Sequence, residues 1–406
     1  MATPDQIQEQ VQLEREAIKC GIDKIHKNTE QLIEKEYASA TVFGCSSIKS
    51  AQSLVADEIL NTFRKNVIEG KNGAAYADIA NHLLQFNTPE DANILANIAL
   101  KRTFDLVFSI KRKESRKYPN TISNVCVSVG ASVEGECQIR WYEQQDPKLL
   151  KRVRDKYWLN TTGTGQKRKV AQIMFNREDY HWDTWSADLR ARLGGWLVGI
   201  VCDVTNWFEK QVTLEGKPRL TLLVPTDEYM LIQEQLMQEA MLFAPMSWPM
   251  LIEPNDWTND HAGGYLLNEV QRGNELVRRG DHSIRQPDTP LAFLNKLQKV
   301  AYRINPFVYG VAKQLDEKGY KVGKFKPLSH AALWEFPLVP LDIATNEESR
   351  KKYKEERTDA ENRKKAYERS MHVRTSITLE LADRFIKRDK FYCPWSFDYR
   401  GRAYPI

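Results

Sequence analysis

Apolar residues recur at steps of three and four along most of the chain, which predicts a mainly α protein. Thr88 followed by Pro89 and two acids is typical of a helix start, because threonine caps the first turn and proline suits its first position. The stretch 186–204 is apolar around most of its circumference, so we expect a buried helix in which Gly194 and Gly195 let another backbone approach closely. The expected helices are residues 5–36, 48–66, 88–110, 186–204 and 294–318, followed by a helical region over 346–390.

The longest regular pattern begins at Leu294 and continues to Leu315 in alternating steps of three and four. It predicts one helix of about seven turns that ends at Gly319, with a kink or local opening at Pro306. A basic stripe lies beside this apolar seam on the same predicted helix. Such a stripe is either a solvated face or a surface for a polyanion. Its members are Lys296, Lys299 and Arg303.

Residues 346–390 are densely charged, and their first part suggests a protruding helix. In the second part, Val373, Ile377, Leu381 and Phe385 follow one another at four-residue steps, so we expect that face to be packed. Arg374 lies at the edge of this face.

Two β-prone runs, WFEKQVTL and RLTLLV, are joined by Glu-Gly-Lys-Pro, which predicts a β-hairpin at about 205–225. Trp207 and Phe208 lie at the start of its first strand. They are either core residues or an exposed wedge. We favour the wedge, because adjacent strand residues point to opposite faces and cannot easily share one core.

Three other stretches give weaker signals. VCVSVGAS (125–132) alternates as a strand does, whereas QIRWYEQQ (138–145) fits either a helix or a strand. TTGTGQKRK (161–169) matches neither phosphate-loop pattern and is interpreted as a flexible basic loop. Prolines and glycines crowd residues 244–266, which predicts an extended segment wrapping a surface.

The composition permits a globular protein of two or three domains, since 42% of its 406 residues are hydrophobic. The sequence has no run of about 18 apolar residues for a membrane helix. From its polar, acidic start we expect no signal peptide. Six cysteines without a CxxC pair and seven histidines without HExxH predict reduced thiols and no metal site. The net charge of +5 allows a polyanionic partner, and the basic run 111–117 is either a solvated helix end or a phosphate contact.

The sequence FDYRGRAYP near residue 400 combines the chemistry needed to hold nucleic acid without reading bases. The planar forks of Arg400 and Arg402 suit phosphates or a 2′-hydroxyl. Gly401 permits the turn between them, and Asp398 can fix one guanidinium. Two aromatic rings, those of Tyr399 and Tyr404, offer stacking faces.

This motif and its context resemble single-subunit DNA-dependent RNA polymerases of the phage and mitochondrial type. The resemblance rests on Asp-x-x-Gly-Arg-x-Tyr at 398–404, on the helix ITLELADRFIKRDKFYCPW before it, and on PMSWPMLIEPNDWTNDHAGGYL upstream. It implies an N-terminal promoter-binding domain over 1–240, an extended linker over 241–290, a helical thumb over 291–390, and the first strand of an incomplete α+β palm over 391–406.

The resemblance also implies roles for particular residues. Residues 398–404, Arg374 and the basic stripe would contact the template and the RNA–DNA hybrid. Trp207 and Phe208 would wedge open promoter DNA, and Lys71 would contact the minor groove upstream. The two aspartates that hold Mg²⁺ for catalysis in this family have no counterpart in residues 1–406, so no catalytic or metal-binding residue is expected here.

We therefore expect the N-terminal portion of a DNA-directed RNA polymerase, a nucleotidyltransferase that is inactive until a C-terminal half completes it. Its expected partners are promoter DNA, the template strand, the RNA transcript and that second half, with no membrane. The expected location is the cytoplasm, that of an infected host cell if the protein is a phage protein. Two alternatives remain open, a stand-alone nucleic-acid-binding or regulatory protein derived from a polymerase and a helical scaffold.

Overall fold

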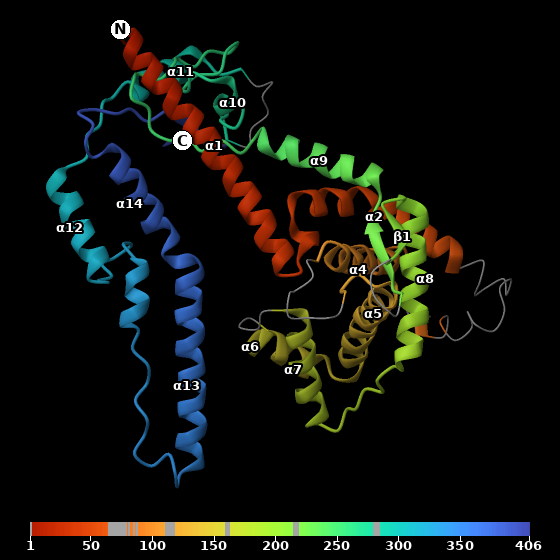
Figure 1. The fold of residues 1–406 in the computed structure, drawn as a ribbon. Coiled ribbons are helices and arrows are strands. Elements are labelled where there is room, and N and C mark those ends of the chain that lie inside the picture. The colour runs from red at the N-terminus through yellow and green to blue at the C-terminus, as the bar shows by residue number, and fades with distance from the viewer. Residues whose placement is uncertain are drawn as a thin grey trace. The chain divides into compact units, whose positions relative to one another are not determined.

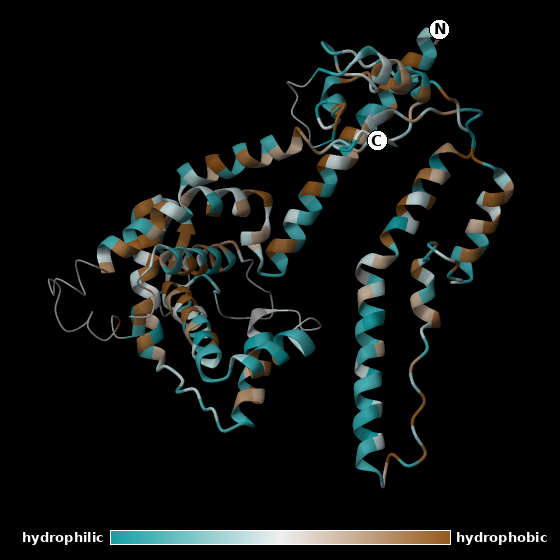
Figure 2. Cartoon of the chain, turned by 180° about the vertical axis from the view of Figure 1, so that it is seen from behind, coloured by the Kyte–Doolittle hydropathy of each residue, from teal (hydrophilic) through white to brown (hydrophobic). Residues whose placement is uncertain are grey.

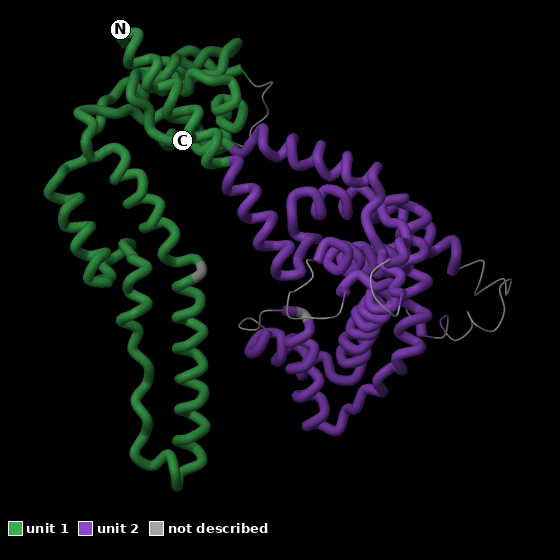
Figure 3. The backbone as a smooth tube through the Cα atoms, viewed as in Figure 1, with its two compact units in different colours: residues 1–21, 245–406 green, residues 22–244 purple. Residues whose placement is uncertain are grey.

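The computed structural model describes residues 2–63, 79, 82–83, 86, 88–109, 118–158, 163–213, 219–278 and 285–406. The chain divides into two compact units (Figure 3). Unit 1 comprises residues 1–21 together with 245–406, and unit 2 comprises residues 22–244. The described part of the chain is mainly helical, as the sequence predicts, and it contains short antiparallel strand pairs. None of the described helices is long and apolar enough to cross a membrane.

Unit 2 is a helical core with one β-hairpin (Figure 1). The first helix, α1 (Pro4–Glu34), contributes its later residues to this unit. The other elements are η1 (Ala38–Ala40), α2 (Val42–Phe63), α4 (Pro89–Val107), α5 (Ile122–Gln145), α6 (Pro147–Lys156), α7 (Thr164–Asn176), α8 (Ala187–Thr205), β1 (Phe208–Val212), β2 (Thr221–Pro225) and α9 (Asp227–Met241).

Helices α5 and α8 pack against each other with their backbones in close contact. A Cβ atom added at Gly194 would lie 1.8 Å from the carbonyl oxygen of Cys126, and one added at Gly130 would lie 2.0 Å from that of Arg190. Only glycine fits at either position, which confirms the role expected for Gly194. At Gly195 an added Cβ would make an ordinary contact, 3.7 Å from the Cys126 sulfur.

The strand suggested by VCVSVGAS is wrong, because residues 122–145 form one helix. Its buried positions include Val125, Val129, Val133 and Cys137, which recur every four residues and face the core of unit 2. The period of two in VCVSVGAS covers one short stretch, whereas the helical period continues to Tyr142. The longer pattern decides the structure, because it buries a complete face.

The predicted hairpin is confirmed: β1 and β2 pair antiparallel, with Phe208 opposite Pro225 and Val212 opposite Thr221. The exposed wedge expected at its base is wrong. Phe208 is buried and Trp207 is partly buried against the same core. Both rings pack edge-on against Phe104, at 5.3 and 5.8 Å between centroids, and Trp207 lies 5.2 Å from the ring of Tyr229.

Both rings fit one core because Trp207 precedes the strand. It is not part of β1, so the alternation of side chains along a strand does not separate the two rings.

The flexible loop expected at 161–169 is also wrong in its second half. Helix α7 begins at Thr164 and includes the three basic residues 167–169. Arg168 donates to the Ala131 carbonyl and pairs with Glu134 of α5, so its positive charge is neutralised by a carboxylate within unit 2. The stacked rings of Tyr142 and Phe175 then join α5 to α7, with 4.1 Å between centroids.

Unit 1 combines the start of α1 with the second half of the chain (Figure 3). Residues 245–267 form the extended segment that the sequence predicts, and it carries Trp248, Met250 and Trp257 as buried residues. The elements that follow are α10 (Asn268–Gln271), α11 (Asp288–Gln298), α12 (Pro306–Glu317), η4 (Leu328–Leu333), α13 (Glu347–Ala366), η5 (Tyr367–Met371), α14 (Val373–Phe385), β3 (Trp395–Phe397) and β4 (Ala403–Pro405).

The single helix expected from Leu294 to Leu315 is two helices, because α11 ends at Gln298 and α12 begins at Pro306. Asn305 caps α12 by accepting hydrogen bonds from two backbone N–H groups, and Pro306 takes the first helical position. The seam is not buried along its whole length either. Leu294 is fully buried, whereas Val308 and Val311 are exposed.

Helix α13 is hydrophilic along its length (Figure 2), in keeping with the charged region expected at 346–390. The packed face expected on α14 is only partly correct. Phe385 is buried, but Val373 and Ile377 are each 41% exposed. Thr375 and Leu379 are buried instead, and the Thr375 hydroxyl accepts a hydrogen bond from the Lys326 N–H.

A buried carboxylate joins the two sequence-distant parts of unit 1. Glu14 on α1 accepts hydrogen bonds from the N–H groups of Leu266 and Leu267, at 3.0 and 2.7 Å, and from the amide of Gln10. Gln10 in turn accepts one from the Leu251 N–H at 2.7 Å. Neither Gln10 nor Glu14 is more than 2% exposed.

Unit 2 has its own buried carboxylate, Glu134 on α5, which is completely buried. Its oxygens accept from Arg190 Nε at 2.7 Å and from the Trp185 N–H at 3.1 Å, and Arg168 pairs with it at 3.3 Å. Burial by itself would raise the pKa of Glu134, but the hydrogen bonds from Arg190, Trp185 and Trp182 outweigh burial, so its pKa lies below the ordinary value.

Replacing Glu134 with alanine should lower the free energy of unfolding by about 3 kcal/mol, because two arginines lose their buried partner. Denaturant unfolding followed by circular dichroism measures the change. Glu136→Ala on the same helix is the matched control. It removes a partly exposed pair with Arg140 and should cost less than about 1 kcal/mol. Equal losses in the two variants would contradict the assignment.

The lowered pKa of Glu134 also predicts a pH dependence. Its stabilisation is complete above the pKa of the unfolded chain and is lost as pH falls through the lower folded pKa. Between about pH 5 and pH 3 the parent should therefore lose stability more steeply than Glu134→Gln. Unfolding free energies measured across that range test this, and parallel curves would exclude it.

Candidate nucleic-acid interface

The motif at 398–402 forms the turn of a small β-hairpin. Strands β3 and β4 pair antiparallel, with Ser396 opposite Tyr404 and Phe397 opposite Ala403. The Asp398 N–H donates to the Arg402 carbonyl at 2.8 Å, and the Gly401 N–H donates to the Asp398 carbonyl at 2.9 Å. Gly401 has a φ of +77°, the left-handed conformation that glycine adopts without strain. The sequence motif is thus a closed turn.

The Asp398 carboxylate holds this turn and one guanidinium together. Its Oδ1 accepts from the N–H groups of Arg400 and Arg402, and its Oδ2 accepts from Arg402 Nε, each at 2.9 Å. Nη2 of Arg402 lies 2.9 Å from the same Oδ2. The backbone N–H of Arg402 is the main cause that lowers the pKa of Asp398, and the Arg402 side chain and the Arg400 N–H act in the same direction. The fixed guanidinium expected from the sequence is Arg402.

The turn presents charge and aromatic rings to the solvent. Arg402 keeps 59% of its side chain exposed although it is paired, whereas Asp398 keeps only 15%. The Arg400 guanidinium lies 5.0 Å from the ring centroid of Tyr399, which is itself 68% exposed. Tyr404 is 37% exposed and lies 5.7 Å from the Arg402 guanidinium. The arrangement can therefore offer cations beside stacking faces.

Two residues that the sequence analysis did not single out support the hairpin from the rest of unit 1. Arg278 donates from Nε to the Ser396 hydroxyl at 2.8 Å and from Nη2 to the Pro405 carbonyl at 2.5 Å. Trp257 donates from its ring N–H to the Trp395 carbonyl at 2.9 Å. Arg278 lies 120 residues before the motif, and no local pattern marks it as a partner of that hairpin.

The other predicted cations are not part of the turn. Lys296 lies in the last turn of α11, Arg303 lies between α11 and α12, and Arg374 lies in the first turn of α14; all three are exposed. Lys299 pairs with Asp256 at 2.9 Å. The basic stripe expected on one continuous helix is thus wrong, because the helix ends before Lys299. Among the described contacts none joins these four cations to Asp398 or Arg402.

The remaining predicted residues lie elsewhere. Trp207 and Phe208 belong to the aromatic core of unit 2, as described above. Lys71 and the basic run 111–117 lie outside the described residues. The hairpin tip at 214–218 does so too.

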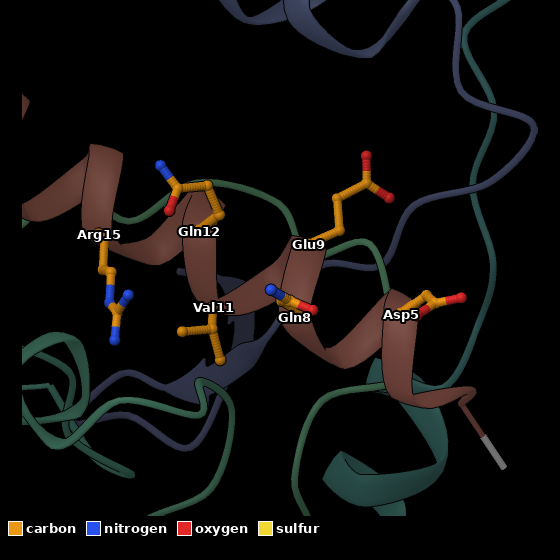
Figure 4. Close-up of a pocket in the computed structure, with 6 residues that line it drawn as sticks. All are labelled: Asp5, Gln8, Glu9, Val11, Gln12 and Arg15. Atoms are coloured by element: carbon orange, nitrogen blue, oxygen red, sulfur yellow. The ribbon is translucent and has the colours of Figure 1, made fainter.

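No metal centre lies at the turn among the described residues. Among them no group of three or more His, Cys, Asp and Glu side chains is placed to hold a metal ion. One hollow of about 380 Å³ is lined by residues of α1 alone. Its side chains diverge, since Glu9 and Gln12 point away from Val11 and Arg15 (Figure 4). This hollow offers no converging groups for a ligand.

Comparison with known proteins identifies the family. Residues 9–301 match the family model described as DNA-directed RNA polymerase N-terminal. The chain belongs to this family. The match covers more than half of the chain and includes both the hairpin of unit 2 and most of α1. The turn at 398–402 lies beyond the matched residues, so its assignment depends on the motif.

Phage and organelle polymerases are among the relatives of this family member. T7 RNA polymerase of Escherichia phage T7 is 22% identical over an alignment that covers 98% of this chain and 45% of the relative. The DNA-directed RNA polymerase of Enterobacteria phage K11 is 24% identical over 56% of this chain and 26% of the relative.

The mitochondrial DNA-directed RNA polymerase of Schizosaccharomyces pombe is 25% identical over 46% of this chain and 16% of the relative. The chain therefore spans less than half the length of these relatives. The resemblance to the N-terminal region of phage-type single-subunit polymerases is confirmed.

The geometry of the turn predicts how it responds to loss of its carboxylate. In Asp398→Ala the N–H groups of Arg400 and Arg402 lose their shared acceptor, so both amides should exchange hydrogen faster, by about tenfold. Asp398→Asn keeps one side-chain acceptor and should fall between. Hydrogen exchange followed by mass spectrometry or NMR measures these rates, with Asp389→Ala as a control on the approach to β3. Unchanged exchange in Asp398→Ala would show that the carboxylate does not hold the turn.

Proposed function

We propose that this chain serves DNA-directed RNA synthesis by holding the RNA–DNA hybrid through the turn at 398–404. The observation that carries the proposal is the Asp398–Arg402 pair. It fixes the guanidinium by two side-chain contacts to one carboxylate oxygen while leaving the arginine more than half exposed. A fixed but accessible guanidinium loses little conformational freedom when it meets a phosphate or a 2′-hydroxyl.

The donors of Arg402 support this use. Nε and Nη2 face Asp398, and no hydrogen bond among the described residues uses Nη1. That side of the guanidinium can contact a polyanion without breaking the pair. Arg400 adds a second cation, and Tyr399 adds an exposed ring next to it. The site recognises backbone and sugar groups, which suits an enzyme that must hold a hybrid of any sequence.

The larger elements take roles consistent with the family. We propose that α13 and α14 form the thumb, that β3 and β4 begin the palm, and that unit 2 contributes promoter binding. The rings of Trp207 and Phe208 are not assigned to promoter melting. In the complete enzyme a C-terminal half would supply the aspartates that hold Mg²⁺, while the residues of this chain bind and orient nucleic acid.

The chain should bind a short RNA–DNA hybrid in a salt-dependent way through Arg402. Arg402→Ala should weaken binding about tenfold and reduce the salt slope by about one unit for each phosphate that the variant no longer neutralises. Arg402→Lys should recover only part of the affinity, because lysine keeps the charge and loses the planar fork. Fluorescence anisotropy with a labelled hybrid at several salt concentrations gives both quantities.

The control for this experiment is Arg152→Ala. It removes the same charge from an exposed pair with Glu178 in unit 2. Parent-like binding is expected for the control. If Arg402→Ala binds like the parent at every salt concentration, the turn is structural and the proposal fails.

A second prediction concerns catalysis. We propose that residues 1–406 alone incorporate no nucleotide, because the two Mg²⁺-holding aspartates that the family resemblance implies have no counterpart in them. The assay uses a primed RNA–DNA scaffold with Mg²⁺ and four nucleotides. Extension above a no-protein reaction would refute this proposal, and restored extension on adding the C-terminal half of a relative would support it.

A further inference from the structure

We propose that Arg278 is a positioning residue for the hybrid-binding turn, clamping β3 to β4 so that Arg402 and Tyr404 keep one orientation. The inference rests on the proposed function for its effect on nucleic acid, but the clamp itself is a property of the free protein. Among the described residues, the side-chain hydrogen bonds and the ring contact of Arg278 lie on the stems of the hairpin and on the ring of Tyr404.

The backbone around Arg278 extends the small sheet on the side of β3. The Phe397 N–H donates to the Leu276 carbonyl, and the Arg278 N–H donates to the Phe397 carbonyl, each at 2.8 Å. Val277 and Phe397 thereby form a parallel bridge. The order across the sheet is residues 276–278, then β3, then β4, so β4 is separated from Arg278 by one strand.

The Arg278 side chain spans that strand. Nε donates to the hydroxyl of Ser396 on β3, and Nη2 donates to the carbonyl of Pro405 on β4. Ser396 is only 1% exposed, so without Arg278 its hydroxyl would lose this partner in a buried place. Strands β3 and β4 pair over only three residues each, and an isolated hairpin of this length is not stable in water. A side chain that bonds both strands therefore fixes their relative position.

Tyr404 links the clamp to the turn. Its ring centroid lies 5.9 Å from the Arg278 guanidinium and 5.7 Å from that of Arg402. Both cations are thus close enough for attraction to the π electrons of the ring. When the clamp is removed, Tyr404 loses one of these cations, and β4 is freer to move relative to Asp398. Arg402 follows β4 because it is the residue before that strand.

Lysine cannot replace Arg278 in this role. The two acceptors lie on different strands, and a planar fork reaches both at once, whereas an ammonium group is a single point charge. Arg278→Lys keeps the charge but should lose the clamp. This distinguishes a positioning role from a simple charge contact with a phosphate, in which lysine would keep at least part of the affinity.

The first measurement uses the free protein. In Arg278→Met and Arg278→Lys, hydrogen exchange at the amides of Asp398, Gly401 and Arg402 should accelerate about tenfold. Arg272→Met is the matched control, since Arg272 is an exposed arginine in the turn after α10. Amides of α8 in unit 2 report whether each variant is folded. Parent-like exchange at 398–402 in Arg278→Met would overturn the clamp, whether or not the chain binds a hybrid.

The second measurement is a double-mutant cycle on binding of the labelled RNA–DNA hybrid. If Arg278 acts through Arg402, Arg278→Met should weaken binding about fivefold in the parent and less than twofold when Arg402 is already alanine. The positioning role is refuted if the losses of affinity caused by the two single substitutions multiply in the double variant. It is also refuted if Arg278→Lys binds the hybrid with full affinity, since that would show a separate charge contact. If the parent itself does not bind, the proposed function fails while the exchange experiment still decides the clamp.

Discussion

The architecture of unit 1 depends on one buried carboxylate. Glu14 on α1 accepts the N–H groups of Leu266 and Leu267, and its neighbour Gln10 accepts that of Leu251. A buried carboxylate is costly unless donors surround it, so α1 and the extended segment must come together for either to be stable. The extended segment has little regular structure to satisfy its own backbone. Side chains from the beginning of the chain therefore replace the partners that a sheet would give.

A short series of hydrogen bonds connects the extended segment that Glu14 and Gln10 hold to the candidate interface at 398–402. Met250 and Tyr392 exchange two hydrogen bonds, at 2.7 and 2.8 Å, which ties the extended segment to the residues just before β3. Trp257 then holds the Trp395 carbonyl and is itself fixed by paired hydrogen bonds with Asn295 of α11. The turn at 398–402 is thus exposed, but the strand that leads into it is anchored on two sides. A mobile turn would lose conformational entropy when its arginines become ordered on binding, which would weaken the affinity. Anchoring the strand reduces this loss.

The two units use the same ion-pair chemistry for different purposes. In unit 2, Glu134 is fully buried and neutralised by Arg168 and Arg190, so those arginines are committed to packing α5, α7 and α8. In unit 1, Asp398 orients an arginine that remains more than half exposed. Exposed pairs contribute little to stability. The Asp398–Arg402 pair therefore serves to hold a guanidinium in one geometry, and we connect it with binding. We connect the buried ion pairs of Glu134 with folding.

The sequence by itself determined the mainly helical class, the β1–β2 hairpin, the extended segment after 244 and the turn at Gly401. These features depend on local rules, such as the capping of α4 by Thr88 and the left-handed conformation available to glycine. The motif at 398–404 also indicated the family, because a few specific residue types in order carry that information. Local rules could not decide whether α12 continues the preceding helix or begins a new one, because Pro306 is compatible with a kink and with a helix start.

Only the tertiary structure decided which polar residues are buried and which distant residues meet. Gln10 and Glu14 look like part of a solvated helix face, and their small neighbours Ala17 and Gly21 are the only local sign that this face is covered. Trp207 and Phe208 share one core because the tryptophan lies before the strand. Arg278 donates hydrogen bonds to Ser396 and Pro405, which lie more than a hundred residues later in the sequence. Burial and long-range pairing result from the packing of complete elements, so a pattern confined to neighbouring residues does not contain them.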